Sequence, residues 1–179
     1  MLVKTPAIVL RQYKLRETSL IVTLYTKSFG KIKGVAKGVR QLKSKRISHF
    51  ELLNYLDLSF YNKSNRELYL ISHTHVYDYF QEIKDDIAAY MHSVYVLELV
   101  DTMTNLSMPQ DVLFTLLHAY LTALKRGDSR LATRAFHAKF LMVSGLFPNV
   151  TECIFCKKKI SGTMPFSLEH GGIVCREHI

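Results

Sequence analysis

The three cysteines of the chain and one late histidine form two closely spaced pairs. Cys153 and Cys156 are separated by two residues, as are Cys175 and His178, and eighteen residues lie between the pairs. Each pair can turn both side chains inward from a tight turn, and two pairs supply the four tetrahedral ligands that zinc prefers. Three thiolates and an imidazole leave no position for water, so we expect one structural Zn²⁺ and not a catalytic one.

The residues between the two pairs bear on this prediction. Gly171 and Gly172 suit the sharp return of the chain that brings the pairs together. His170 is near enough to compete as a ligand, but it lacks the paired spacing. A cluster of free thiols without a metal is the alternative interpretation.

Positive charge is concentrated at the start of the chain. The first fifty residues hold twelve lysines and arginines and a single acid, Glu17, whereas the remaining residues hold 12 basic and 14 acidic side chains. An excess of eleven positive charges over fifty residues repels itself and favours a phosphate-bearing partner over a merely solvated surface.

The basic residues cluster further within this segment. Lys31, Lys33 and Lys37 alternate with small or apolar residues, so a strand there would place the three lysines on one face. Residues 37–46 are basic and aperiodic, which predicts a mobile loop. Interleaved aromatic residues could stack on bases, although we expect most of them in the core. The candidate DNA-binding residues are Arg11, Lys31, Lys33, Lys37, Arg40, Lys43, Lys45 and Arg46.

Short β-type segments carry this basic region. They lack the helical spacers that parallel sheets require, which predicts a small antiparallel barrel. An OB-fold fits best, and an SH3-like barrel is the alternative. The five predicted strands are residues 7–14, 19–26, 31–37, 52–61 and 67–73, with a hairpin loop at 27–30.

After residue 79 the apolar period changes to that of helices. We expect one long helix through Thr104, a second that begins after Pro109 and stops at Gly127, and a third capped by Asp128 or Ser129. The predicted buried face of the first helix is Phe80, Ile83, Ile87, Met91, Val94, Leu97 and Met103.

The predicted class is therefore α+β. Residues 1–78 form an OB-fold DNA-binding domain, 79–150 a helical domain, and 151–179 a zinc-ribbon-like module packed with the helical domain. No apolar run approaches the roughly 18 residues that span a bilayer, and the N-terminus does not resemble a signal peptide, so we expect a cytoplasmic protein.

Several segments together resemble the bacterial recombination mediator family RecO. They are residues 7–11, 17–20, 26–31, 34–40, 97–101, 145–148, 166–167 and 171–175, in the family's order. His178 stands where the family more often has cysteine, which zinc accepts equally. The chain ends one residue later, whereas family members usually continue into further helices.

The resemblance implies a function in the DNA repair and recombination pathway that involves RecF. It implies binding of single- and double-stranded DNA, annealing of complementary strands, and assistance in loading RecA onto DNA coated by single-strand binding protein. RecR and the acidic tail of that binding protein are the implied partners. The implied location is the nucleoid of a bacterial cytoplasm.

No motif of the chain supports catalysis. We find no catalytic triad, paired carboxylates or phosphate-binding glycine loop, and we interpret Asp101 with Glu98 as solvated helix surface. A second hypothesis is an adaptor that captures an acidic peptide through the helical domain. Its candidate residues are Lys125, Arg126, Arg130 and Arg134. A zinc-dependent hydrolase would require an open metal site.

Overall fold

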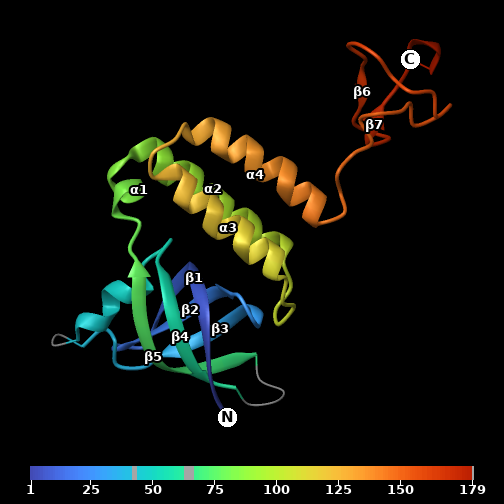
Figure 1. Ribbon diagram of the computed structural model, residues 1–179. Coiled ribbons are helices and arrows are strands. Elements are labelled where there is room, and N and C mark those ends of the chain that lie inside the picture. Colours follow the sequence, from blue (N-terminus) through green and yellow to red (C-terminus); the bar gives the residue numbers. More distant parts are fainter. Residues whose placement is uncertain (42–43, 63–66, 179) are drawn as a thin grey trace. The chain divides into compact units, whose positions relative to one another are not determined.

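The computed structural model describes residues 1–41, 44–62 and 67–178. It forms two compact units, Met1–Lys139 and Phe140–Ile179 (Figure 1). Within the described residues, no helix combines the length and hydrophobicity needed to cross a membrane.

Five strands of the first unit close into a barrel. They are β1 (Leu2–Leu15), β2 (Ser19–Thr26), β3 (Gly30–Ala36), β4 (Tyr55–Tyr61) and β5 (Leu68–Asp78). The order around the barrel is β1-β2-β3-β5-β4, with β3 and β5 parallel and the other neighbours antiparallel. This is the arrangement of a five-stranded OB-fold, so the predicted barrel is confirmed.

Alternation along each strand fills the barrel. Inward side chains are aliphatic or aromatic and exclude water, whereas their neighbours face outward. The interior cluster consists of Ala7, Val9, Leu20, Val22, Leu24, Ile32, Ala36, Val39, Phe50, Leu56, Leu58, Phe60 and Ile71.

The predicted hairpin between β2 and β3 ends at Gly30, which contacts the loop between two helices. Gly30 has φ +65°, and a Cβ placed there would overlap the main-chain carbonyl of Met108. The amide of Ser107 donates to the carbonyl of Lys31 at 2.8 Å. The hairpin tip and this loop are therefore in direct backbone contact.

Gly30→Ala should destabilise the first unit by about 3 kcal/mol, because it adds strain at positive φ to a clash with backbone. Urea denaturation followed by circular dichroism measures this loss. Gly38→Ala is the matched control. Gly38 has φ +68°, but its added Cβ would meet only Gln41 side-chain atoms at 3.7 Å, so we expect a loss of about 1 kcal/mol. Equal losses would contradict the close contact.

Two parts of the barrel differ from the sequence prediction. Strand β1 begins at Leu2 and β5 continues to Asp78, because pairing with β4 extends both. The segment predicted as a mobile loop, residues 37–46, overlaps the first two residues of a 3-10 helix, η1 (Lys45–Phe50), which begins where the Ser44 hydroxyl accepts from the amide of Arg46 at 3.3 Å. Phe50 anchors this helix in the barrel interior.

The predicted helix of residues 80–104 is wrong in its continuity. It consists of α1 (Gln81–Asp85) and α2 (Ile87–Met103), separated by Asp86 in an extended conformation. The Asp86 carboxylate accepts from the amide of Ala89 at 3.1 Å and caps α2. This break turns α2 relative to the expected face.

The predicted buried face is consequently right only in part. Phe80, Ile83 and Leu97 are buried as predicted, whereas Ile87 is 84% exposed, Met91 64% and Met103 51%. The other buried residues of α2 are Ala89, Ser93, Val96 and Val100.

The other two helices agree with the prediction. They are α3 (Asp111–Leu124) and α4 (Ser129–Val143). The Asp128 carboxylate accepts from the amide of Leu131 at 3.1 Å, as expected of a capping residue. Tyr120 of α3 shares a 3.0 Å hydrogen bond with Thr133 of α4.

Ion pairs connect the barrel to α1 and α3. Lys84 contacts the Glu51 carboxylate at 2.9 Å, and Lys125 contacts Asp78 at 2.6 Å. These ion pairs thus attach the helices to the barrel at the end of β5 and at Glu51, directly after η1.

The second unit has little regular structure. It contains the end of α4, the two-residue strands β6 (Phe166–Ser167) and β7 (Gly172–Ile173), and the 3-10 helix η2 (Arg176–His178). Its cysteines are not paired as disulfides.

Candidate metal centre and nucleic-acid interface

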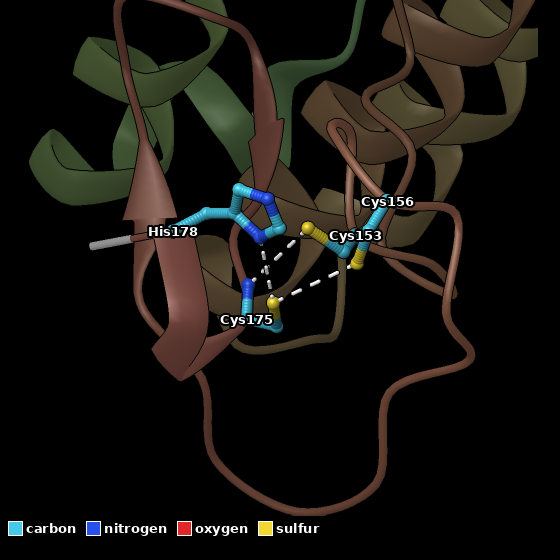
Figure 2. Close-up of side chains that lie close together, drawn as sticks. All are labelled: Cys153, Cys156, Cys175 and His178. Atoms are coloured by element: carbon cyan, nitrogen blue, oxygen red, sulfur yellow. Dashed lines mark hydrogen bonds between the residues drawn. The ribbon is translucent and has the colours of Figure 1, made fainter.

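The two predicted ligand pairs meet in the second unit. One ligand atom from each of Cys153, Cys156, Cys175 and His178 lies within 4.8 Å of the other three (Figure 2). Cys156 Sγ lies 3.7 Å from Cys175 Sγ, and Cys175 Sγ lies 3.2 Å from His178 Nδ1. A tetrahedral zinc with Zn–S bonds of about 2.3 Å separates two sulfurs by about 3.8 Å. The donor set and its spacing therefore fit such an ion.

Backbone amides favour the charged form of the buried cysteine. Burial opposes ionisation of Cys153, but amides of Cys156, Cys175 and Phe155 outweigh it and lower the pKa of the thiol to about 6. The amide of Cys175 donates to Cys153 Sγ at 3.4 Å. Cys153 is thus prepared to act as a thiolate ligand at neutral pH.

Main-chain contacts hold the two pairs together. The amide of Ile154 donates to the carbonyl of Ile173 at 3.0 Å. Gly172 lies directly against the side chain of Ile154, where a Cβ would overlap it, and Gly171 has φ +64°. Both glycines therefore make the sharp return that the sequence predicted. Lys158 and Glu177 form an ion pair at 2.9 Å between the same two segments.

His170 lies outside the group of four. Its Nδ1 is 3.1 Å from the Ser167 hydroxyl, and its ring lies 5.0 Å from that of Phe155. The paired spacing thus distinguished the clustered histidine from this neighbouring one.

Three of the predicted DNA-binding residues are exposed cations. Lys33 lies on β3, Lys37 follows this strand directly, and Lys45 begins η1. Within the part of the chain that the structure describes, none of the three forms an ion pair. They are available to a phosphate group.

Lys31 departs from the expected row of three exposed lysines. It is only 8% exposed, and its ammonium contacts both the main-chain carbonyl and the carboxylate of Asp101, the latter at 3.2 Å. Arg11 binds the other oxygen of Asp101 at 2.6 Å. The interpretation of Asp101 as solvated surface is therefore wrong, because this side chain joins α2 to β1 and β3.

The remaining candidates occupy intermediate positions. The guanidinium of Arg40 donates to the carbonyl of Arg16 at 3.0 Å, and that of Arg46 donates to the carbonyl of Ser72 on β5 at 3.3 Å. Both side chains are half-buried. Lys43 lies outside the described residues.

Acids from later in the chain compensate part of the N-terminal charge. Four cations of the first fifty residues form ion pairs with these later acids: Lys4 with Asp57, Arg11 and Lys31 with Asp101, and Lys27 with Asp111. The charge excess seen in the sequence is therefore larger than the excess at the barrel surface.

Asp101→Asn should destabilise the first unit by about 2 kcal/mol, because it leaves the Lys31 ammonium buried without a counter-charge. Denaturant titration measures the change, and a second substitution, Lys31→Met, should restore most of it. Asp111→Asn is the matched control, because its pair with Lys27 spans 3.7 Å between exposed side chains and should contribute less than about 0.5 kcal/mol. Equal effects of both variants would contradict a structural role for Asp101.

Comparison with known protein families covers nearly the whole chain. The family model described as Recombination protein O N terminal matches residues 1–80, and Recombination protein O C terminal matches residues 84–179. The chain belongs to the RecO family. Its fold, a barrel followed by helices and a Cys/His cluster, agrees with this membership.

Several curated members of the RecO family are similar over almost this entire sequence. The DNA repair protein RecO of Alkaliphilus metalliredigens is 34% identical over 99% of this chain and 72% of its own length. That of Caldicellulosiruptor saccharolyticus is 31% identical over 98% of this chain and 71% of its own length. That of Listeria monocytogenes serotype 4b is 32% identical over 96% of this chain and 67% of its own length. RecO membership supports a role in DNA repair and recombination.

Proposed function

We propose that this protein binds single- and double-stranded DNA and anneals complementary strands, and that with RecR it assists RecA loading onto DNA coated by single-strand binding protein. The observation that carries the proposal is the set of exposed cations Lys33, Lys37 and Lys45 on an OB-fold barrel. OB-folds bind nucleic acid through their strands and adjoining loops. In this proposal the barrel binds DNA, while residues 79–150 and 151–179 bind partner proteins.

Annealing requires no chemical bond to form, only a lower repulsion between two phosphate backbones. Cations that contact phosphates release condensed counterions, and they leave the bases of a single strand free to pair. The mechanism therefore assigns binding roles to the lysines and no catalytic role to any residue.

The metal in this proposal is a structural zinc ion. Cys153, Cys156, Cys175 and His178 would hold it, and a full set of four protein ligands leaves no position for a reacting water. The small second unit has few hydrophobic residues to bury, so metal binding supplies folding free energy that its core lacks.

Annealing of complementary oligonucleotides, measured against salt concentration, tests this function. We expect annealing to be faster with the protein, and log affinity for single strands to fall by about 0.7 per phosphate contact for each log unit of salt. The measurement is repeated with strands coated by single-strand binding protein, with and without RecR. Absence of binding to either strand at low salt would contradict the proposal.

A second candidate function is an adaptor for an acidic peptide tail. A cavity of about 120 Å³ lies between α3 and α4, lined by apolar residues and Lys139, and Arg130 and Arg134 of α4 are exposed. Lys125 is less available, because Asp78 and Glu82 hold its ammonium at 2.6 and 3.6 Å. Binding of such a peptide after the barrel charges are reversed would favour this function.

A further inference from the structure

Outward side chains of β1, β4 and β5 form rows across the barrel, on strands that lie side by side (Figure 1). The register shows which residues are neighbours. The rows are Leu2 with Tyr61 and Leu70, Lys4 with Ser59 and His73, and Pro6 with Asp57 and His75. Tyr77 follows two residues beyond His75 on the same side of β5.

Four of these side chains, Tyr61, His73, His75 and Tyr77, are exposed rings, and we call them the ring surface. Tyr61 is 43% exposed and Tyr77 53%, whereas the inward residues of β5 are buried or packed against the core. The ring of Tyr77 contacts two others, with centroids 5.5 Å from that of His75 and 5.2 Å from that of Tyr55. The rings of His75 and Tyr77 meet edge to face, at an interplanar angle of 85°.

Positive groups border the ring surface. Asp57 is the one acidic residue among the described residues of these three rows. Its side chain is buried and forms an ion pair with Lys4 at 2.7 Å. Lys33 of β3 pairs with Leu68, at the start of β5, and Arg46 reaches the carbonyl of Ser72. Burial lowers the pKa of His49, and the charges of Arg46, His73 and His75 lower it further.

We propose that the ring surface binds the bases of single-stranded nucleic acid while the bordering cations contact its phosphates. Stacking on aromatic side chains is how proteins hold single strands without reading their sequence. A duplex hides its base faces, so the surface should discriminate for single strands. This inference rests on the proposed DNA-binding function. OB-folds ordinarily bind nucleic acid on the face of strands 2 and 3, whereas the ring surface lies on the opposite side of the barrel, on β4 and β5.

The spacing of residues along β5 supports an unstacked strand. Residues two apart on a strand are separated by about 6.7 Å, whereas stacked bases of a duplex strand are 3.4 Å apart. Bases held at alternate positions of β5 would therefore be drawn apart from one another, which leaves their hydrogen-bonding edges available for pairing.

The test compares two fluorescent 20-mers, oligothymidylate and an abasic strand of the same length, by anisotropy titration of the full chain. Tyr61→Ala/Tyr77→Ala should weaken binding of oligothymidylate by about tenfold for each ring lost and leave binding of the abasic strand unchanged. Tyr61→Phe/Tyr77→Phe keeps both rings and should bind like the original protein. Tyr77→Leu keeps the contact with Tyr55, so it separates lost stacking from lost stability.

Each outcome decides between the two proposals. An unchanged affinity for oligothymidylate, or an equal loss on both strands, would overturn the ring surface and leave the DNA-binding function standing. If the original protein binds neither strand at low salt, both proposals fail. If sedimentation shows that the alanine variant loses self-association and not DNA binding, the rings serve a second copy of the chain instead.

Discussion

Replacing Lys33, Lys37 and Lys45 together with glutamate is expected to weaken binding to single-stranded DNA by at least about a hundredfold at 100 mM salt. Each lysine that contacts a phosphate contributes to the salt-dependent part of the affinity, and each reversal adds repulsion. Anisotropy titration over several salt concentrations gives both the affinity and its slope. The slope should decrease by about 2 because three contacts of about 0.7 each are lost.

The choice of these three lysines follows from the structure. Lys31 is omitted because its replacement would leave Asp101 with one cation fewer and disturb the attachment of α2. Arg40 is omitted because it donates to the carbonyl of Arg16. The unfolding midpoint of the triple variant should therefore equal that of the original protein.

A matched variant separates local contacts from overall charge. Arg126→Glu/Arg130→Glu/Arg134→Glu makes the same change of charge at exposed positions after α3 and on α4. We expect it to lower DNA affinity far less than the barrel variant does. If the two variants lose affinity equally, or if the barrel variant binds normally at moderate salt, the barrel is not the binding surface.

Cys153→Ser is expected to abolish stoichiometric metal binding and to unfold residues 147–178, while the barrel remains folded. A metal site of this type supplies folding free energy outright, apparent values being about 10 kcal/mol or more for small zinc modules. Elemental analysis gives the metal content, and hydrogen exchange reports protection in each segment. Added chelator should reproduce both effects in the original protein.

His170→Ala is the control for the metal site, because this histidine lies near the four clustered residues but bonds to Ser167. It should keep one metal ion for each chain. Retention of the metal by the Cys153 variant, or its loss from the His170 variant, would show that the ligand set is assigned incorrectly.

Acidification should release the metal, because protons compete with the ion for the three thiolates and the imidazole. Without metal, the pKa of Cys153 is lowered from an ordinary value of 9.0 to about 6, so the stabilisation due to its thiolate is complete above that ordinary value and is lost as the pH falls through about 6. Because a bound metal also opposes protonation, a metal-sensitive dye should detect release only at or below about pH 6. Release that begins above pH 8 would contradict a thiolate site of this kind.

Sequence patterns predicted the features of this chain that depend on residues close together in the sequence. The cluster of three cysteines and one histidine follows from the spacing within each pair, and the barrel follows from alternation and from the absence of helical spacers. The start of α4 follows from a capping residue, Asp128. The spacing of each Cys/His pair and the helix cap are each contained within a few residues.

The features that sequence reasoning missed depend on contacts between distant segments. Lys31 meets Asp101 across seventy positions of the chain, so the buried lysine resembles its exposed neighbours in sequence. The break at Asp86 changes the rotation of α2 relative to α1, so the apolar residues after Phe80 do not share one continuous face. Sequence reasoning missed this break because a capping aspartate does not interrupt the apolar pattern. The ring surface depends on the register between β4 and β5, which alternation alone does not give.

The close packing of Gly30 against Met108 limits how the barrel can be exchanged between relatives. A glycine at the hairpin tip and a matching path of the loop after α2 must be inherited together, since the carbonyl occupies the space that any side chain would need. A chimaera that joins the barrel of one family member to the helices of another should therefore take both sides of this contact from one parent. The junction between the two parental sequences should therefore lie after this loop and not at the end of β5.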